Sequence, residues 1–271
     1  MIEALQYDFV RNALLAGLLA SVACGVIGTY VVVKKIVFMS GGISHASLGG
    51  IGIGQFLGIN PLLGAFFYTL ASAIGMGVVV RRTKLPEDVT IGALWVLGMA
   101  LGVIFHDLAP GTVPGLPSYL FGDLSLTSSS DLILMAALDA VIILTVSLLY
   151  KEFLILSFDE EFGESVGAPM EKSYLVLLCL IALSVVVMVR VMGVILVIAL
   201  LALPVATGWQ FTHSLKKLML FSILLGLIST TLGIGLWYEF NLASGPAIVL
   251  VSIPLFALSF LFARLRRRRV E

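Results

Sequence analysis

Two ionisable side chains interrupt long apolar stretches of this sequence, and their types suit the binding of a cation. His45 lies in a glycine-rich segment between Ser44 and Ser47, and Asp139 has only apolar neighbours. Imidazole and carboxylate groups both bind divalent metal ions, and in hydrocarbon each is costly unless it faces a cavity or a partner. We predict that His45 and Asp139, with the hydroxyls of Ser44 and Ser47, line an ion path. The alternative for each is a structural hydrogen bond to a neighbouring helix.

Polar residues in two connectors, 106–131 and 239–246, offer further ligand atoms. The first connector has polar ends, three prolines and an apolar centre that suits dipping back into a membrane. Charged residues in exposed loops are more often simply solvated. The possible outer-face ligands are His106, Asp107, Asp123 and Glu239.

A cluster of carboxylates follows position 158 and predicts a short acidic helix on the membrane surface, ended by a glycine and a proline. Its negative charge does not suit an anionic lipid surface, so a protein partner is the better explanation. The residues of this coupling segment are Asp159, Glu160, Glu161, Phe162, Glu164 and Gly167.

The composition shows what kind of element must position these residues. Of the 271 residues 60% are apolar and 12% are charged, and the mean hydropathy is +1.13. Soluble domains have about 45–50% apolar and about 25% charged residues. A soluble enzyme, a nucleic-acid binder and a disordered chain are therefore excluded. Cys24 and Cys179 stand alone in apolar runs and show neither a metal-binding nor a disulfide pattern.

Apolar segments long enough to cross about 30 Å of hydrocarbon recur along the chain. Eight are clear: 13–33, 61–80, 89–105, 132–150, 174–189, 191–211, 218–238 and 242–263. A ninth, 43–58, is shorter and rich in glycine. We predict an all-α membrane protein with a single domain over residues 1–271, built as a polytopic bundle of eight or nine transmembrane helices. A proline at position 204 is expected to kink its helix.

The basic residues predict the orientation. All except Arg11 and Arg190 fall in alternate connectors or in the carboxyl-terminal tail: Lys34, Lys35, Arg81, Arg82, Lys84, Lys151, Lys172, Lys216, Lys217, Arg264 and Arg266 to Arg269. The positive-inside rule places these connectors in the cytoplasm. We expect a multi-pass protein of the plasma (inner) membrane with its amino terminus outside and its carboxyl terminus cytoplasmic. Arg190 is interpreted as an interfacial anchor.

Small residues recur every four positions in the glycine-rich segment. Ala46, Gly50, Gly54 and Gly58 would share one face of a helix, and Gly98 and Gly102 form a shorter pair of the same kind. In lipid such faces let helix backbones approach closely. The pattern predicts tight helix packing around His45.

The order and spacing of several motifs resemble the ABC-3 permease family, the membrane subunits of ABC importers for zinc and manganese. These motifs are Ser44-His45-Ala46 with Leu48-Gly49-Gly50, Tyr119 to Asp123, Asp159 to Gly167, Gly193 to Pro204 with Ala206-Thr207, and Ser244 to Leu250. The resemblance covers nearly the whole chain. It implies the fold of a type II-like importer, with residues 151–173 as the cytoplasmic segment that couples to an ATPase.

The resemblance also implies partners. It predicts a homodimer of permease chains, two separate cytoplasmic ATP-binding subunits, and an extracytoplasmic metal-binding protein that delivers the ion. The chain has no G-x-x-x-x-G-K-[ST] phosphate loop, so it is expected to be a transport subunit and not an enzyme. No cofactor is expected to stay bound; Zn²⁺ or Mn²⁺ is the cargo. Family members commonly carry an aspartate where this chain has Gly41, and the remaining nitrogen ligand puts zinc ahead of manganese.

Two other transport functions remain open at this point. One is a permease for a metal chelate such as a siderophore or cobalamin, which would need a wider cavity. The other is a secondary metal transporter driven by protons, with Asp139 as the proton carrier. A membrane enzyme is disfavoured because no paired acid and base stand at a membrane face.

Overall fold

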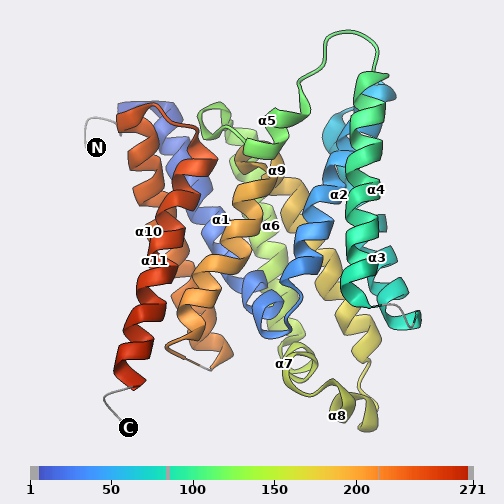
Figure 1. Cartoon of the computed structure of the whole chain (residues 1–271), viewed down its shortest axis with the longest axis vertical. Helices are drawn as coiled ribbons and strands as arrows, with labels where there is room; N and C mark the ends of the chain where they lie inside the picture. The colour runs from blue at the N-terminus through green and yellow to red at the C-terminus, as the bar shows by residue number, and fades with distance from the viewer. Residues whose placement is uncertain (1–5, 84–85, 213, 268–271) are drawn as a thin grey trace.

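The computed structural model describes residues 6–83, 86–212 and 214–267, and within these ranges the regular structure is helical. Figure 1 shows the helices as a bundle whose long members run between two opposite ends. In chain order the elements are α1 (Asp8–Val33), α2 (Val37–Phe56), α3 (Pro61–Arg82), α4 (Glu87–Asp107), α5 (Leu116–Phe121), the 3-10 turn η2 (Leu124–Leu126), α6 (Ser129–Leu148), α7 (Tyr150–Phe158), α8 (Glu160–Ser165), α9 (Met170–Trp209), α10 (Leu215–Phe240) and α11 (Ser244–Arg267). The expected all-α bundle is confirmed.

The number of crossings agrees only roughly with the expected eight or nine. Seven helices of the described chain are long and apolar enough to cross a membrane. The difference arises because the predicted segments 174–189 and 191–211 are parts of one 40-residue element, α9, and because α2 is not among the seven. The two arms of α9 meet near one end of the bundle and run to the other (Figure 1). If each arm and α2 count as crossings, the described residues make nine.

The turn between the arms of α9 lies at Gly193, near the predicted boundary between the segments 174–189 and 191–211. Gly193 has φ 76° and ψ 159°, whereas Pro204 is buried inside the second arm. Such a backbone conformation is essentially restricted to glycine. A single proline removes one backbone donor, and neighbouring helices in a membrane protein commonly tolerate this loss.

Three glycines let α5, α9 and α11 meet at this turn. A Cβ atom on Gly193 would lie 2.4 Å from the backbone nitrogen of Gly122, which itself has φ 69°. A Cβ atom on Gly245 would lie 2.5 Å from the carbonyl oxygen of Phe121. The backbones therefore touch at this end of the bundle, and no side chain larger than hydrogen fits between them.

Helix α2 packs closely against α3 along part of the predicted small-residue face. A Cβ atom on Gly50 would lie 2.4 Å from the carbonyl oxygen of Gly64, and one on Gly54 would lie 2.9 Å from Cα of Pro61. Gly58 does not belong to this face, contrary to the sequence prediction. It lies beyond the end of α2 with φ 65°, and the amide of Ile59 donates to the carbonyl of Gly54 across it. Gly58 is thus a helix-ending residue.

The other side of α2 packs against α4, the helix that carries the predicted Gly98 and Gly102 pair. A Cβ atom on Gly98 would lie 2.7 Å from Cα of Ala46, and one on Gly52 would lie 2.2 Å from the carbonyl oxygen of Gly102. Helix α2 is therefore held between α3 and α4 with little side-chain volume in between. Helix α9 packs against α2 and α3 as well as against α1, α6, α10 and α11, and so connects these three helices to the rest of the bundle.

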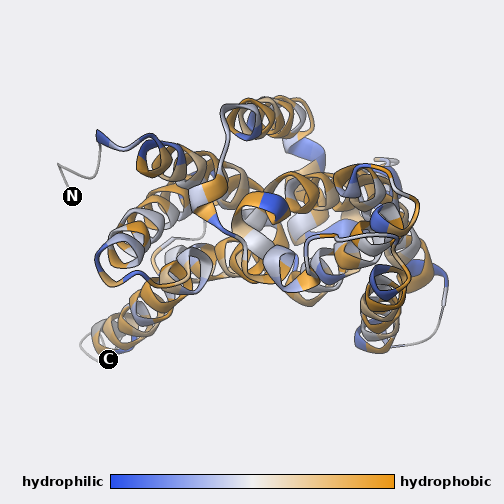
Figure 2. Cartoon of the chain, turned by 90° about the horizontal axis from the view of Figure 1, so that it is seen from above, coloured by the Kyte–Doolittle hydropathy of each residue, from blue (hydrophilic) through white to orange (hydrophobic). Residues whose placement is uncertain are grey.

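Hydrophobic residues make up most of the helices (orange in Figure 2), and many of their side chains are exposed on the outside of the bundle. Phe67, Val96, Ile133, Leu144 and Leu250 are each more than 60% exposed. A soluble protein rarely exposes such contiguous apolar area, whereas lipid accommodates it. The chain is a multi-pass membrane protein.

Most of the basic residues lie toward one end of the bundle, whereas Arg11 and Arg190 lie toward the other. Those of the larger set stand where α1 and α3 end, where α7, α9 and α10 begin, and near the end of α11: Lys34, Lys35, Arg81, Arg82, Lys151, Lys172, Lys216, Lys217 and Arg264. Lys84, Arg268 and Arg269 lie outside the described residues. Helix α1 begins at the opposite end, where α11 also begins (Figure 1).

Candidate functional site

His45 lies at the junction of α2 and α4. Its ring stacks on the indole of Trp95, with ring centroids 4.4 Å apart and an interplanar angle of 16°. The close approach of α2 and α4 at Ala46 and Gly98 places the two rings against each other. The Nδ1 atom of His45 is buried and has no hydrogen-bond partner in the described part of the chain. A buried polar atom without a partner is costly, so a bound ligand that bonded to this nitrogen would be favoured.

The neighbours of His45 on α2 leave space beside it. The Ser44 hydroxyl donates to the carbonyl of Ser40 at 2.8 Å, and the Ser47 hydroxyl donates to the carbonyl of Ser44 at 2.6 Å. Their oxygens keep lone pairs to offer a cation. A Cβ atom on Gly41, one turn before His45, would meet no atom within 4 Å. Room for a ligand therefore adjoins the imidazole on its own helical face.

Asp139 lies in α6. It is 6% exposed, and neither carboxylate oxygen has a hydrogen-bond partner among the described residues. Helix α6, which carries it, packs against α1 and α9. There Cys24 of α1 contacts the sulfur of Met188 at 3.8 Å. The sequence predicted a partner for Asp139 and a path shared with His45; the structure places the two residues on α6 and α2, which both pack against α9.

The predicted outer-face ligands do not gather around a common point. His106 Nδ1 lies 2.7 Å from Gln55 Oε1, so His106 connects the end of α4 to α2. Gln55 in turn donates to the carbonyl of Pro114 at 2.9 Å and ties the loop after α4 to α2. Asp123 accepts from the backbone amide of Ser125 at 2.9 Å and caps η2. The remaining two candidates, Asp107 and Glu239, are exposed.

The described residues do not form a metal site with the usual number of protein ligands. Their histidine, cysteine, aspartate and glutamate side chains form no group of three or more that could hold an ion. A conduction path differs from a resident metal site in this respect, because binding must be weak enough for the ion to leave.

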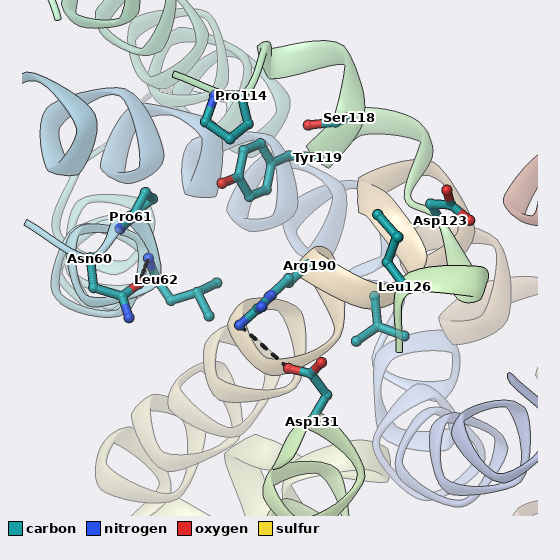
Figure 3. Close-up of a pocket in the computed structure, with 11 residues that line it drawn as sticks. Asn60, Pro61, Leu62, Pro114, Ser118, Tyr119, Asp123, Leu126, Asp131 and Arg190 are labelled. Atoms are coloured by element: carbon teal, nitrogen blue, oxygen red, sulfur yellow. Dashed lines mark hydrogen bonds and ion pairs between the residues drawn. The ribbon is translucent and has the colours of Figure 1, made fainter. Parts of the chain in front are cut away.

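A cavity of about 620 Å³ opens at the end of the bundle opposite the coupling segment, beside the turn of α9 (Figure 3). An ion pair crosses it, with 3.5 Å between Arg190 Nη1 and Asp131 Oδ1. The interpretation of Arg190 as a plain interfacial anchor missed this partner. Burial raises the pKa of the Tyr119 phenol in the cavity wall, although the charge of Arg190 opposes the shift. The Ser128–Asp131 spacing typical of a capping box was the sequence signal for a buried aspartate here.

The segment predicted to couple to an ATPase forms two short helices, α7 and α8, at the basic end. Asp159 accepts from the amide of Phe162 at 2.9 Å and caps α8, and Gly167 follows the helix with φ 77°. Glu161, Phe162 and Glu164 are exposed.

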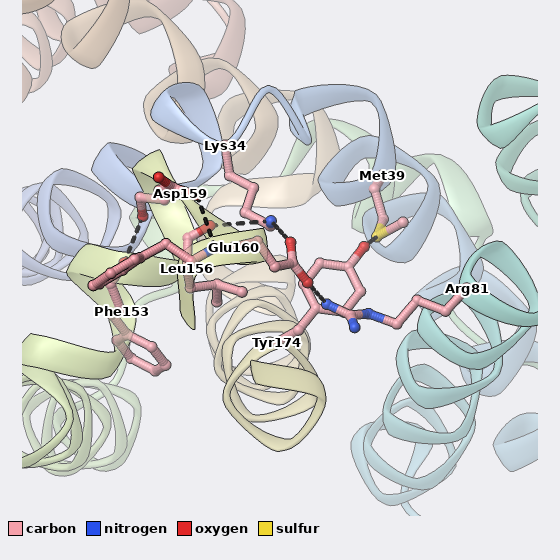
Figure 4. A network of polar contacts seen from close by, with 10 residues as sticks. Lys34, Met39, Arg81, Phe153, Leu156, Asp159, Glu160 and Tyr174 are labelled. Atoms are coloured by element: carbon pink, nitrogen blue, oxygen red, sulfur yellow. Dashed lines mark hydrogen bonds and ion pairs between the residues drawn. The ribbon is translucent and has the colours of Figure 1, made fainter. Parts of the chain in front are cut away.

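Glu160 differs from its acidic neighbours because it points into the protein (Figure 4). Its Oε2 pairs with Lys34 and its Oε1 with Arg81. Partial burial alone would raise the pKa of this carboxyl, but the hydrogen bonds and charges of Lys34 and Arg81 outweigh it and hold the pKa below its usual value.

This pKa shift predicts how stability depends on pH. Because the folded-state pKa of Glu160 is depressed, its ionised carboxylate stabilises the folded protein fully at pH values above about 4.5, the ordinary pKa of a glutamate. This stabilisation disappears as the pH falls through the lower pKa of the folded state. We expect thermal unfolding in detergent to lose part of its pH dependence below pH ~4.5 in Glu160→Gln. An unchanged pH profile in this variant would show that the ion pairs contribute nothing.

Three comparisons place this architecture among known proteins. The family model described as the ABC 3 transport family matches residues 6–263. The membrane protein slr2045 of Synechocystis sp. is 43% identical over 264 residues, which cover 97% of this chain and 94% of that protein. The manganese transport system membrane protein MntC of Listeria monocytogenes is 34% identical over 259 residues, covering 96% of this chain and 92% of MntC.

A solved structure shares the fold. The structure of PsaBC from Streptococcus pneumoniae in complex with Fab contains a chain that superimposes with a TM-score of 0.86 at 30% identity. The match covers 96% of this chain and 94% of that one. The same helical arrangement is therefore present in the solved structure of another protein.

Proposed function

Because the chain belongs to the ABC 3 transport family, as its motifs suggested, we propose that it is the permease subunit of an ATP-driven importer for divalent transition-metal ions. It is a metal transport permease and not itself an enzyme. Zinc is the proposed cargo, with manganese second. The observation that carries the ion path is the buried, unpartnered Nδ1 of His45 beside the open space at Gly41.

The choice of zinc rests on the chemistry of the donor atoms. Imidazole nitrogen suits zinc, whereas manganese prefers oxygen ligands. Position 41, one helical turn before His45 on α2, supplies no oxygen ligand, because Gly41 carries no carboxylate. The name of the Listeria relative, a manganese transport protein, is the reason to test both ions side by side.

The proposed partners follow from the two ends of the bundle. The exposed apolar side chains of Phe158, Phe162 and Val166 on the coupling segment, with Glu161 and Glu164 beside them, form a surface suited to an ATPase. The positive-inside rule puts this basic end in the cytoplasm, with the amino terminus outside. The outer cavity at Arg190 would then face an extracytoplasmic metal-binding protein, and a homodimer of permease chains completes the assembly.

The test of the ion path is uptake of radioactive zinc and manganese into proteoliposomes that hold the permease with its ATPase and binding protein. We expect His45→Ala to lower ATP-dependent uptake by about tenfold or more, as loss of a metal-binding interaction typically does. His106→Ala is the matched control, because the imidazole of His106 already has a hydrogen-bond partner in Gln55. Uptake by His45→Ala at the wild-type rate would remove His45 from the path.

The same preparation separates the other transport functions. Competition by a siderophore or cobalamin, with none by free ions, would indicate a chelate permease. Uptake without ATP that stops on adding a proton uncoupler would indicate a secondary transporter.

A further inference from the structure

We propose that Glu160 is a positioning residue that transmits movement of the coupling segment to the helices of the ion path, and that it does not contact the ATPase. This inference rests on the proposed function. It separates Glu160 from Glu161 and Glu164, which the sequence placed in the same coupling role.

The geometry around Glu160 is that of a clamp between two cations. One carboxylate oxygen pairs with Lys34 and the other with Arg81. The side chains are 27%, 15% and 22% exposed for Glu160, Lys34 and Arg81. Lys34 also donates to the carbonyl of Leu156 in α7 at 3.1 Å. Figure 4 shows the three side chains converging over Tyr174.

Each of the two cations lies at the end of a helix that leads into α2 or packs against it. Lys34 caps α1, directly before Lys35, whose φ of 62° turns the chain into α2. Arg81 lies in the last turn of α3, which packs along α2. One carboxylate at the start of α8 therefore joins the coupling segment to the start of α2 and the end of α3.

A second connection runs through Tyr174 of α9. The Arg81 guanidinium lies 4.5 Å from the centre of the Tyr174 ring, a cation–π distance. The Tyr174 hydroxyl donates to the sulfur of Met39 at 3.3 Å, and Met39 lies in the first turn of α2. A displacement of α8 thus reaches α2, the helix of His45, by two routes.

Charge explains why removal of Glu160 would disconnect these elements. Without its carboxylate, the ammonium of Lys34 and the guanidinium of Arg81 face each other as like charges in a half-buried site. Their repulsion would part the α1–α2 turn from α3. Glu161 and Glu164 are exposed and form no ion pair with a described residue, so their charges are free to meet a partner.

The experiment measures ATPase co-purification, ATP hydrolysis and metal uptake for each variant in the reconstituted complex. For Glu160→Gln we expect wild-type ATPase binding but a fall of about fivefold or more in metal transported per ATP, the low end of typical coupling between sites. Asp88→Asn removes an exposed carboxylate in the first turn of α4, outside the coupling segment, so it is the matched control and should leave transport per ATP unchanged.

A charge-inverted triple variant keeps the test independent of local folding. Glu160→Lys alone should uncouple more strongly than Glu160→Gln. Lys34→Glu and Arg81→Glu, added to it, surround one ammonium with two carboxylates and should restore transport per ATP to within about twofold.

Two results would overturn the inference. One is wild-type transport per ATP in Glu160→Gln; the other is loss of the ATPase from Glu160→Gln together with full activity of the complex that remains, which would make Glu160 a docking contact. Failure of the proposed function looks different, because the wild-type complex itself would then show no ATP-dependent uptake of either ion.

Discussion

Gly193→Ala is expected to destabilise the fold by about 2–6 kcal/mol, the sum of backbone strain and overpacking at about 1–3 kcal/mol each. The strain arises because Gly193 has φ 76° and ψ 159°, which a residue with a side chain adopts only at a cost. The overpacking arises because the new methyl group would lie 2.4 Å from the backbone nitrogen of Gly122 and from the carbonyl carbon of Phe121. Both contacts are with backbone, so no side-chain rotation relieves them.

The measurement is thermal unfolding of the purified permease in detergent, followed by tryptophan fluorescence and by size-exclusion chromatography. Gly75→Ala is the matched control, because its new methyl group would meet no atom within 4 Å in the middle of α3. Alanine is favoured over glycine in a helix interior, so this variant should be as stable as the wild type or more so. If both variants unfold at the wild-type temperature, the turn of α9 is not held by the contact between Gly193 and Gly122.

The turn of α9 also shows where prediction from sequence ends. Proline at position 204 carries a strong local signal for a kink, yet its helix continues through it. The real turn depends on contacts between Gly193 and Gly122, which are distant in sequence, and a single chain does not reveal such pairs. The lengths of the apolar segments did predict that two of them meet near position 190, because segment length can be read from the local sequence.

The glycines of α2 illustrate the same division. Their four-residue spacing predicted a face for close helix packing, and Gly50 and Gly54 do approach α3. The spacing did not reveal that Gly52 serves α4, or that Gly58 ends the helix. Periodicity describes one helix, whereas the neighbours on each side depend on the order in which the whole bundle packs.

For the candidate site, residue type was informative and grouping was not. His45 was identified because an imidazole in an apolar run is rare, and it does have a free ring nitrogen. Its expected companion Asp139 lies on a helix packed with α1 and α9. Glu160 was grouped with the other acidic residues of its segment, although its two ion pairs turn it inward. The pairing of side chains from different helices is tertiary information.

Asp139→Leu is expected to raise the free energy of unfolding by about 1–3 kcal/mol, the usual cost of a buried polar group without a hydrogen bond. Neither oxygen of Asp139 has a partner among the described residues, and the side chain is 6% exposed. Leucine would replace an unbonded carboxyl by a group that the apolar surroundings solvate. Thermal unfolding in detergent measures the change, and uptake in proteoliposomes measures its effect on transport.

Asp131→Asn is the matched control on the same helix, and its effect on stability should have the opposite sign. Asp131 is also buried, but its Oδ2 accepts from the Ser128 amide at 3.0 Å and hydroxyl at 2.6 Å, and its Oδ1 pairs with Arg190. Loss of this cap and ion pair should destabilise the protein by about 1 kcal/mol. Burial is similar at the two positions, so the difference in sign reflects the polar partners that Asp131 has and Asp139 lacks.

The joint outcome for Asp139→Leu decides what the carboxyl is for. If the variant is more stable than the wild type but its ATP-driven uptake is lower, the wild-type protein retains Asp139 for transport. The reason is that a buried group that destabilises the fold and has no other use would be expected to be lost. We expect this outcome. A variant that is more stable and transports at the wild-type rate would show that Asp139 takes no part in the ion path, and a variant that is less stable would show that the carboxyl has a structural partner after all.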